Sequence, residues 1–372
     1  MVNVMKVVFW VSAACVFYTY AGYYLLLRIM AFFHPRPAHK ATVTPSVSIV
    51  MAVHNEESLL PNKLINLRSL AYPPDRIQIV VVSDGSTDRT AMLLQRASDV
   101  TAVLLEEAVG KASALNAAVR NATGDLLVFF DVRQTVDHDA LQELVSGFAD
   151  DSVGAVSGEL LLESSPGVPS GDALGIYWKI EKSMRKFESL SGSVVGATGA
   201  IYAVRRDLYR DLPEGTILDD VLTPMNVIRA GKRVLFEPGA IARDRIFSQP
   251  GKEFSRKIRT LTGNYQLVQL APWLLSPNNP LLFRFISHKL FRLAVPLWLL
   301  LMLLTSAFAG GALYLSAFIL QSLCYAAAGL AIVMPASRKM KLVRIAHTFL
   351  MLNAAALSAF YNFAAGRKKI WV

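Results

Sequence analysis

The chain is poor in the residues on which thiol chemistry and disulfide frameworks depend. Its 372 residues include only two cysteines, Cys15 and Cys324, and both lie in apolar segments. Cysteines in such positions are typical of packing residues, which disfavours a disulfide framework or a thiolate metal site. The sequence also contains neither G-x-G-x-x-G nor a Walker loop. Dinucleotide oxidoreductases and P-loop enzymes are therefore disfavoured as well.

Charged residues are scarce and unevenly divided. They make up 18% of the chain, with 38 Lys and Arg against 28 Asp and Glu, which leaves a formal net charge of +10. Hydrophobic residues reach 53% and the mean hydropathy is +0.39, so part of the chain is predicted to lie in lipid. Because the basic residues cluster beside apolar segments, we expect membrane lipids and a phosphate-rich substrate as partners, and no nucleic acid.

An uncharged segment near the N-terminus predicts a membrane anchor. Residues 7–27 contain no Asp, Glu, Lys or Arg and match the thickness of a bilayer as a helix. A signal peptide is the competing interpretation, since Lys6 precedes the segment, but no clear small-residue cleavage site follows it. We therefore expect a transmembrane anchor over residues 1–30.

A second uncharged region, residues 293–334, is long enough for a transmembrane hairpin with its turn at Gly310-Gly311. Basic residues flank it on both sides, which places both ends in the cytoplasm and predicts a multi-pass protein of the inner (plasma) membrane with a cytoplasmic catalytic domain. Residues 345–366 are a further transmembrane or re-entrant helix. A crossing there would leave the basic residues 367–369 outside, against the same rule.

Between these regions the chain changes character twice. Residues 249–292 alternate basic and apolar side chains, which predicts amphipathic helices on the headgroup layer. The alternative is an ordinary amphipathic helix packed on the soluble domain. Residues 45–248 alternate apolar strands, at 47–53, 77–82 and 126–130, with helical segments, and a helix is expected to open at 55–57. This pattern predicts a mostly parallel sheet covered on both faces.

Three short acidic motifs follow one another in this soluble region. They are SDGSTD (residues 83–88), VFFDVR (residues 128–133) and ILDD (residues 217–220). Acids at strand ends lie where α/β sheets bind nucleotides. Their order and spacing resemble a membrane-embedded family 2 inverting glycosyltransferase of the bacterial polysaccharide synthase type, over residues 45–270. The resemblance implies a GT-A-like α/β fold, with transmembrane and interfacial helices at both ends.

The resemblance implies a donor site for a nucleotide-diphosphate sugar, UDP-linked by preference. Asp84 matches the residue that contacts uracil, and Glu56 lies in the opening segment AVHNEE (residues 52–57) near the base. Lys111 lies in GKASALN (residues 110–116), which borders the donor. Asp131 matches the first acid of a D-x-D motif that holds Mg²⁺ or Mn²⁺ on the diphosphate.

The acceptor side is implied by two further segments. Gly199 belongs to GATG (residues 196–199), which lies beneath the acceptor in the family. Asp219 and Asp220 match the acidic pair, and Asp220 matches the general base. A base of this kind must reach the acceptor hydroxyl, and a carboxylate beside anionic phosphates can have its pKa raised.

Two segments depart from the family pattern. Arg133 stands where a second D-x-D acid is usual, so either Asp131 alone binds the metal or Arg133 neutralises phosphate directly. In RKIRT (residues 256–260), Arg259 matches the arginine of Q-x-x-R-W, while Arg256 replaces its glutamine and the tryptophan is absent. Arginines there still suit pyrophosphate. Gln266 follows and is expected to face the same pocket.

The resemblance therefore implies inverting transfer of a sugar to a growing polysaccharide at the cytoplasmic membrane face. A lipid or polyprenyl-linked acceptor is the alternative within the same chemistry. A non-catalytic membrane scaffold with a degenerate transferase domain stays open, because two motifs are altered. Three or four spans are few for a polysaccharide pore, so a homo-oligomer is also considered.

Overall fold

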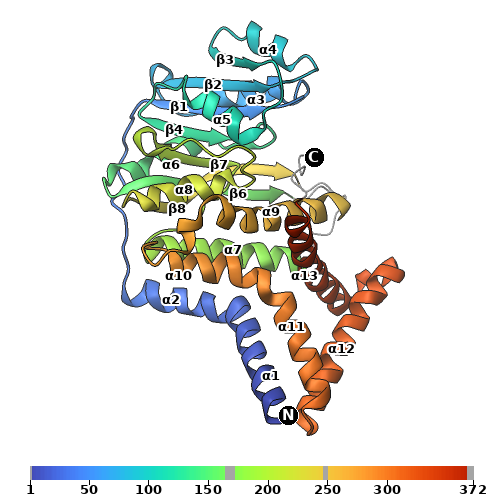
Figure 1. The fold of residues 1–372 in the computed structure, drawn as a ribbon. Helices are drawn as coiled ribbons and strands as arrows, with labels where there is room; N and C mark the ends of the chain where they lie inside the picture. Colours follow the sequence, from blue (N-terminus) through green and yellow to red (C-terminus); the bar gives the residue numbers. More distant parts are fainter. Residues whose placement is uncertain (1, 164–171, 246–249, 367–372) are drawn as a thin grey trace.

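The computed structural model describes residues 2–163, 172–245 and 250–366. Figure 1 shows an α/β region above a group of long helices, with α7 (Asp172–Leu190) and α9 (Pro250–Leu270) between the two. The predicted acids lie on the α/β region, and the long helices extend away from it.

One mixed sheet forms the centre of the α/β region. Its eight described strands run in the order β3-β2-β1-β4-β7-β6-β8-β5. The strands are β1 (Val47–Val53), β2 (Ile77–Asp84), β3 (Val100–Leu105), β4 (Leu126–Phe130), β5 (Thr135–Val136), β6 (Val153–Glu163), β7 (Ile201–Arg205) and β8 (Arg233–Arg245). The first four in this order are parallel to one another, whereas β7 is antiparallel to β4 and β6.

This topology brings the predicted acids to one edge. The chain leaves β1 for β2 on one side and later adds β4 on the other, so the strand order reverses between β1 and β4. Ligands of open α/β sheets bind at the carboxyl ends beside such a reversal. Asp84 ends β2 and Asp131 follows β4, so both lie at that edge. The GT-A-like, mostly parallel arrangement predicted from the sequence is confirmed.

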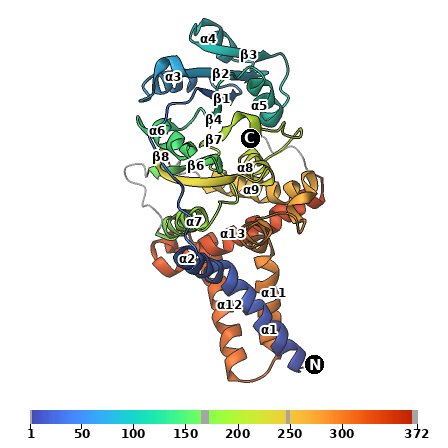
Figure 2. The ribbon, with the colours of Figure 1, turned by 90° about the vertical axis from the view of Figure 1, so that its left-hand side faces the viewer.

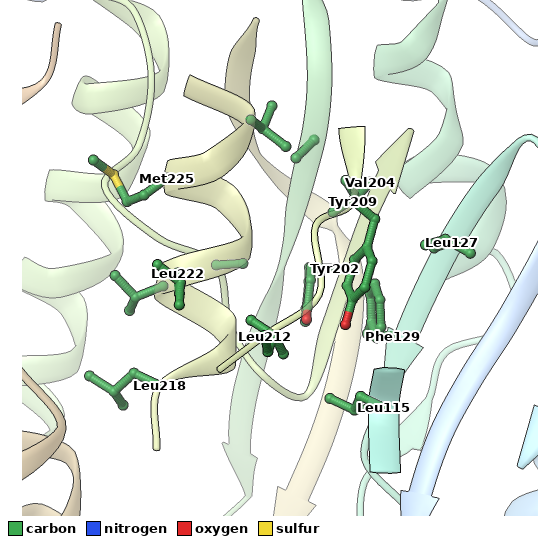
Figure 3. Packing of buried hydrophobic residues seen from close by; sticks show 14 of the residues in the cluster. Leu115, Leu127, Phe129, Tyr202, Val204, Tyr209, Leu212, Leu218, Leu222 and Met225 are labelled. Atoms are coloured by element: carbon green, nitrogen blue, oxygen red, sulfur yellow. The ribbon is translucent and has the colours of Figure 1, made fainter. Parts of the chain in front are cut away.

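Side chains of alternating strand residues feed two apolar clusters, one on each face of the sheet. Ile49 and Met51 pack with leucines of α3 (Leu60–Arg68) and α6 (Ala140–Ser146), while Val50 packs on the side of α5 (Lys111–Val119) and α8 (Asp219–Arg229). Figure 3 shows the second cluster, where the Phe129 and Tyr202 rings are stacked with centroids 4.6 Å apart. The sheet is thus buried on both faces. The apolar side chains of α8 belong to the second cluster and fix the helix on the sheet.

Four apolar helical segments of the described chain are long enough to cross a bilayer. They are Val2–Phe33, Leu282–Phe308, Ala312–Val333 and Lys341–Ala364. Helices α11 (Phe291–Phe308) and α12 (Ala312–Val333) are joined at Gly310 and Gly311, whose φ angles of +67° and +96° are open to glycine without strain. The last segment is α13 (Lys341–Ala364).

The N-terminal segment is not one straight helix. Helix α1 (Val2–Phe17) passes through a π-helical turn at Tyr18–Gly22 into α2 (Tyr23–Phe33). Figures 1 and 2 show α1 beside α11, pointing away from the sheet, and α2 turned to lie against α7. The Tyr23 hydroxyl donates to the Glu188 carboxylate of α7 at 2.7 Å. This polar contact holds the second half of the anchor on the α/β region.

Helix α9 contacts protein on two sides. A Cβ at Gly263 would lie 2.6 Å from the Leu218 side chain, so only glycine admits the loop before α8 this close. On another side, the Tyr265 ring stacks on Phe363 of α13 with centroids 5.5 Å apart. The headgroup helices predicted at 249–292 therefore include a helix that packs on the soluble domain, which was the alternative interpretation.

Candidate active site

The segment after β1 is held by the segment after β2. Asn55 has a φ of +55°, and its side-chain oxygen accepts from the Thr87 amide at 2.8 Å. The Glu56 amide donates to the Thr90 hydroxyl at 2.8 Å. The helix expected to open at 55–57 begins only at Leu60, and the left-handed φ of Asn55 is incompatible with an α-helix at that residue. Burial and the nearby Asp88 raise the pKa of Glu56, which lies half-buried at this edge.

Asp84 fixes the loop before α5. Its side chain is almost fully buried, and its two carboxylate oxygens accept from the amides of Val109 at 2.7 Å and Gly110 at 3.0 Å. The next residue, Gly85, has a φ of +59°, and a Cβ there would lie 2.3 Å from the Ala108 nitrogen. The predicted base-reading carboxylate is therefore also the anchor of the donor-side loop.

Lys111, at the start of α5, joins two of the predicted acids. Its Nζ lies 3.1 Å from the Asp131 carboxylate and 3.4 Å from that of Asp219. Burial alone would lower the pKa of Lys111, but Asp131, Asp219 and Asp220 together raise it above its usual value. The lysine is therefore a permanent cation at the centre of the site, where it offsets the charge of the acids.

Asp220 lies in the first turn of α8, half-buried, over the GATG segment. Its Oδ2 accepts from the Gly199 amide at 3.1 Å, and a Cβ at that glycine would lie 3.1 Å from the same oxygen. Burial and then the charge of Asp219 raise the pKa of Asp220 to about 6, against the opposing charges of Lys111 and other cations. A carboxylate with this pKa is suited to accept a proton near neutral pH.

Arg133 is committed to another acid. Its guanidinium donates to the Asp244 carboxylate of β8 at 2.5 Å, and the Gln134 amide donates to the same oxygen at 3.1 Å. Asp244 is almost fully buried. Direct neutralisation of a phosphate by Arg133, one of the two sequence interpretations, would therefore compete with a buried ion pair. Breaking such a pair is costly.

The side-chain amide of Gln266 is hydrogen-bonded to the loop before α8. Its oxygen accepts from the Ile217 amide at 2.9 Å and its nitrogen donates to the Gly215 carbonyl at 2.8 Å. Both ends of the amide hold the loop before Asp219, so the contact of this side chain with the substrate stays a prediction. Gln266 is a positioning residue for α8.

The two arginines predicted to close over the diphosphate lie on α9, Arg256 exposed and Arg259 half-buried. Among the residues that the structure describes, no hydrogen bond or ion pair joins Arg259 to Asp131 or Asp220. Contacts among the described residues thus gather Lys111, Asp131, Asp219, Asp220 and Gly199, and the role of the two arginines stays a prediction.

Three buried or half-buried polar residues that were not predicted as site residues make hydrogen bonds in this part of the structure. The Arg185 guanidinium of α7 donates to the Ala197 carbonyl at 3.0 Å and to the Thr198 hydroxyl, next to Gly199. Asn116 accepts from the Tyr209 hydroxyl at 2.8 Å. The Lys63 ammonium donates to the Gln134 carbonyl at 2.7 Å, and burial lowers the pKa of this lysine to about 7.

Of these three, only Asn116 lay in a motif, GKASALN. Arg185 and Lys63 stand in helices whose sequence shows no more than an amphipathic pattern. Only the packing of α7 and α3 reveals which of their polar side chains turn toward the site.

The sheet topology is that of a GT-A-like α/β fold, with the predicted acids at one edge of the sheet. Residues 48–212 match the family model described as Glycosyl transferase family 2. The chain therefore contains a glycosyl transferase family 2 domain, as its motifs predicted.

Curated proteins with similar sequences are named as synthases or transferases of sugars. One is a poly-beta-1,6-N-acetyl-D-glucosamine synthase of Staphylococcus aureus, 22% identical over 253 residues, which cover 66% of this chain and 61% of that protein. Another is a probable glycosyltransferase of Bacillus subtilis, YdaM, 27% identical over 213 residues, covering 53% of this chain and 50% of that one. The chain thus spans about three fifths or less of the length of these relatives.

A solved structure shares the fold over almost the whole chain. It is a mannosyltransferase from Pyrobaculum calidifontis in complex with GDP-Man and Mn²⁺, with a TM-score of 0.71 and 23% identity. The match covers 97% of this chain and 99% of that one, so the apolar helices are included in the likeness.

Proposed function

We propose that this protein is a membrane glycosyltransferase that moves a sugar from a nucleotide-diphosphate sugar to an acceptor hydroxyl, with inversion. One observation carries the proposal: Lys111 joins Asp131 and Asp219, while Asp220 stands beside them with a raised pKa over Gly199. A cation for the diphosphate and a base for the acceptor are thus held close to the same pair of acids, Asp131 and Asp219. The family 2 domain supports the same chemistry.

In the proposed reaction Asp220 takes the proton of the acceptor hydroxyl. The acceptor oxygen bonds to the anomeric carbon from the face opposite the nucleotide, and the bond from that carbon to the diphosphate breaks. The electron pair leaves with the nucleoside diphosphate. Lys111 carries a positive charge close to where negative charge develops, and such preorganised charges stabilise the transition state.

Asp131 is the residue proposed to hold Mg²⁺ or Mn²⁺ together with the diphosphate. Its side chain is 38% exposed, with one oxygen bonded to Lys111. No cluster of three or more His, Cys, Asp or Glu that would hold a metal occurs within the described residues. The donor set still fits, since Mg²⁺ is commonly held by one or two carboxylates plus substrate phosphates. When bound, such an ion would neutralise charge on the leaving diphosphate.

The donor is proposed to be UDP-linked, with a GDP-linked sugar as the competing choice because the solved mannosyltransferase was bound to GDP-Man. A growing polysaccharide is the first proposed acceptor, supported by the similarity to a poly-N-acetylglucosamine synthase. A lipid-linked acceptor is the competing choice within the same chemistry. The transferase domain is proposed to face the cytoplasm, on the basic residues flanking residues 293–334.

The decisive experiment uses the full chain in membranes with a panel of radiolabelled UDP- and GDP-sugars, followed by mass analysis of the product. We expect one donor to be consumed and nucleoside diphosphate released, with loss of activity on chelation and recovery on addition of Mn²⁺. The Asp220→Asn variant serves as the control for background hydrolysis. No release from any donor, with or without Mn²⁺, would favour the non-catalytic scaffold instead.

A further inference from the structure

The GATG segment, just before β7, holds the proposed base by its main chain and by its side chain. The Ala197 amide donates to the Asp220 carbonyl at 2.7 Å, and the Gly199 amide donates to the Asp220 carboxylate at 3.1 Å. Between them, the Thr198 amide donates to the Ser157 hydroxyl of β6 at 2.9 Å. The direction of the Asp220 carboxylate therefore depends on where this short segment lies.

Arg185 of α7 binds the same segment through its acceptor groups. The two terminal nitrogens of its guanidinium donate to the Ala197 carbonyl, at 3.0 Å, and to the Thr198 hydroxyl. Ala197 is buried, and in the part of the chain that the structure describes no other group donates to its carbonyl. Buried carbonyl groups are almost always hydrogen-bonded, so this oxygen depends on the arginine. One guanidinium thus fixes the segment that carries the base.

Helix α7 is itself held by buried contacts on either side of Arg185 in the sequence. The preceding residue, Met184, is buried against Tyr23 of the anchor. One turn later, the Glu188 carboxylate accepts from the Tyr23 hydroxyl at 2.7 Å and lies 2.9 Å from the His288 ring. Arg185 therefore extends from a fixed helix, and it links the base to the helix on which the anchor packs.

Arg185 also adds a positive charge beside the proposed base. Asp220 faces charged groups on four elements, which are Asp219 of α8 itself, Lys111 of α5, Arg185 of α7 and Lys289 of the turn Ile286–Leu290 before α11. Burial and Asp219 raise the pKa of Asp220, whereas the three cations lower it. Loss of any one of these cations should therefore raise the pKa of the base.

We propose that Arg185 is a positioning residue for the base of the transfer reaction. It fixes a carbonyl and a hydroxyl of the GATG segment, and the amides of that segment aim the Asp220 carboxylate at the acceptor hydroxyl. A displacement of about 1 Å in a reacting group can cost about 10²-fold in rate, so an exact position of the base matters. This inference rests on the proposed transferase function and adds α7 to its machinery.

A direct contact between Arg185 and the substrate is the competing role. Both terminal nitrogens of the guanidinium are already used on protein oxygens. A substrate contact would have to replace the bond to the buried Ala197 carbonyl and leave that oxygen without a donor, which is costly. The contacts therefore favour a role exerted through the GATG segment.

The test measures transfer by Arg185→Met in membranes that contain the full chain, with the radiolabelled UDP- or GDP-sugar that the panel shows to be consumed. We expect kcat to fall about ten- to hundredfold at an unchanged donor KM, because the base is no longer aimed. The acid limb of kcat should also move to higher pH, because a positive charge beside Asp220 is lost. The matched control is Lys186→Met, at the exposed neighbouring position, which should change none of these quantities.

Arg185→Lys separates the charge of the arginine from its shape. Lysine keeps the positive charge but lacks the planar fork that reaches two oxygens at once. We expect the acid limb to stay at its wild-type position while kcat is about three- to tenfold lower. Thermal unfolding shows whether each variant folds. If Arg185→Met does not fold, Arg185→Lys decides the question, and a wild-type kcat in it would overturn the inference.

A double-mutant cycle with Thr198→Val tests whether the effect passes through the GATG segment. Removing this hydroxyl alone should lower kcat about threefold, because one of the two bonds made by Arg185 is lost. In the Arg185→Met background the same substitution should change little, since the bond is already absent. Effects that simply multiply would show that Arg185 acts elsewhere.

Three outcomes would contradict the role of Arg185 and leave the transferase function standing. They are a wild-type kcat in folded Arg185→Met, a higher donor KM at an unchanged kcat, and a lower kcat with an unmoved acid limb. Absence of nucleoside diphosphate release by the wild-type protein from every donor would instead overturn the transferase function, and the inference with it.

Discussion

The proposed donor edge (Asn55, Asp84 and the loop before α5) and the proposed acceptor edge (Gly199, Asp219 and Asp220) are built from different interactions. At the donor edge, the buried Asp84 carboxylate is matched by two backbone amides, and Asn55 by the Thr87 amide. At the acceptor edge, Asp220 receives one amide and otherwise faces charges, those of Asp219, Lys111 and Lys289. At the first edge each carboxylate oxygen accepts a backbone hydrogen bond, whereas the second edge is balanced by opposing charges.

This difference gives the two edges different properties: the first holds a loop in place, and the second carries a titratable carboxyl group. A buried carboxylate with a backbone amide on each oxygen is satisfied and holds a loop in one conformation. A half-buried carboxylate among mixed charges keeps a pKa that its neighbours can move. The donor edge is therefore suited to recognition of a rigid nucleotide, and the acceptor edge to proton transfer. The predictions below test whether the two edges can be disturbed independently.

The strongest test of the acceptor edge is Asp220→Asn. The amide keeps the shape of the side chain but cannot accept the proton, so kcat should fall by about 10²- to 10⁴-fold while donor binding stays largely intact. Transfer assays and donor titration measure the two quantities. As a matched control, Asp211→Asn removes an exposed carboxylate paired with Arg120 and should leave both unchanged. Transfer at the wild-type rate by Asp220→Asn would remove this residue from the role.

The proposed donor edge should be disturbed most by Gly85→Ala. Alanine there must adopt a φ near +59° and would press its Cβ against the Ala108 backbone, so the loop held by Asp84 must move. We expect a loss of about 2–4 kcal/mol in the free energy of unfolding and a higher KM for the donor.

The control for this variant is Gly231→Ala, at a φ of +81° with open space around the new methyl group. It should cost only about 1–2 kcal/mol and leave the donor KM unchanged. Chemical denaturation and donor saturation curves measure both. Equal losses for the two variants would show that the clash with Ala108 is relieved at no cost.

The acceptor edge also predicts a pH dependence. Burial and Asp219 raise the pKa of Asp220 to about 6, so the carboxyl is protonated and inactive below that pH. Activity should therefore rise along an acid limb centred near pH 6 and be roughly tenfold below its plateau at pH 5.

Neighbouring charges should move this limb in opposite directions. Asp219→Asn removes a negative charge and should shift the midpoint down, whereas Lys289→Gln removes a positive charge and should shift it up. The pH profile of kcat for each variant measures the shifts. The control is Lys341→Gln, which removes an exposed lysine at the start of α13. Shifts of the same sign would mean that the limb does not report Asp220.

The smallest expected effect concerns the loop between the two edges. Gln266→Leu removes the hydrogen bonds to Ile217 and Gly215, worth about 1 kcal/mol each, and loosens the loop that leads into Asp219. We expect kcat to fall a few-fold at an unchanged donor KM. Ser255→Ala, exposed on the same helix, is the control and should change neither. A change in donor KM alone would return Gln266 to the substrate-binding residues.

The fold of the donor edge was predictable in detail. Strands at 47–53 and 126–130 were expected with the bounds that the structure has, because continuous apolar runs of this length between turn residues are typical of buried strands. The helix expected at 55–57 was wrong in its start, because Asn55 takes a left-handed φ of +55° while its side chain bonds to the distant Thr87 amide. A propensity for helix at one position gives no information on such a partner.

Local sequence determined the parts of this protein that depend on neighbours along the chain: the apolar helices, the buried strands and the acids that follow them. Tertiary structure alone decided that Lys111 joins Asp131 and Asp219, that Gln266 holds a loop, and that Arg185 bonds to the segment before Gly199. The physical reason is the range of the forces. The periodicity of buried residues depends on residues that are close in sequence. Charge and hydrogen bonding act between atoms that only the packed chain brings within a few ångströms.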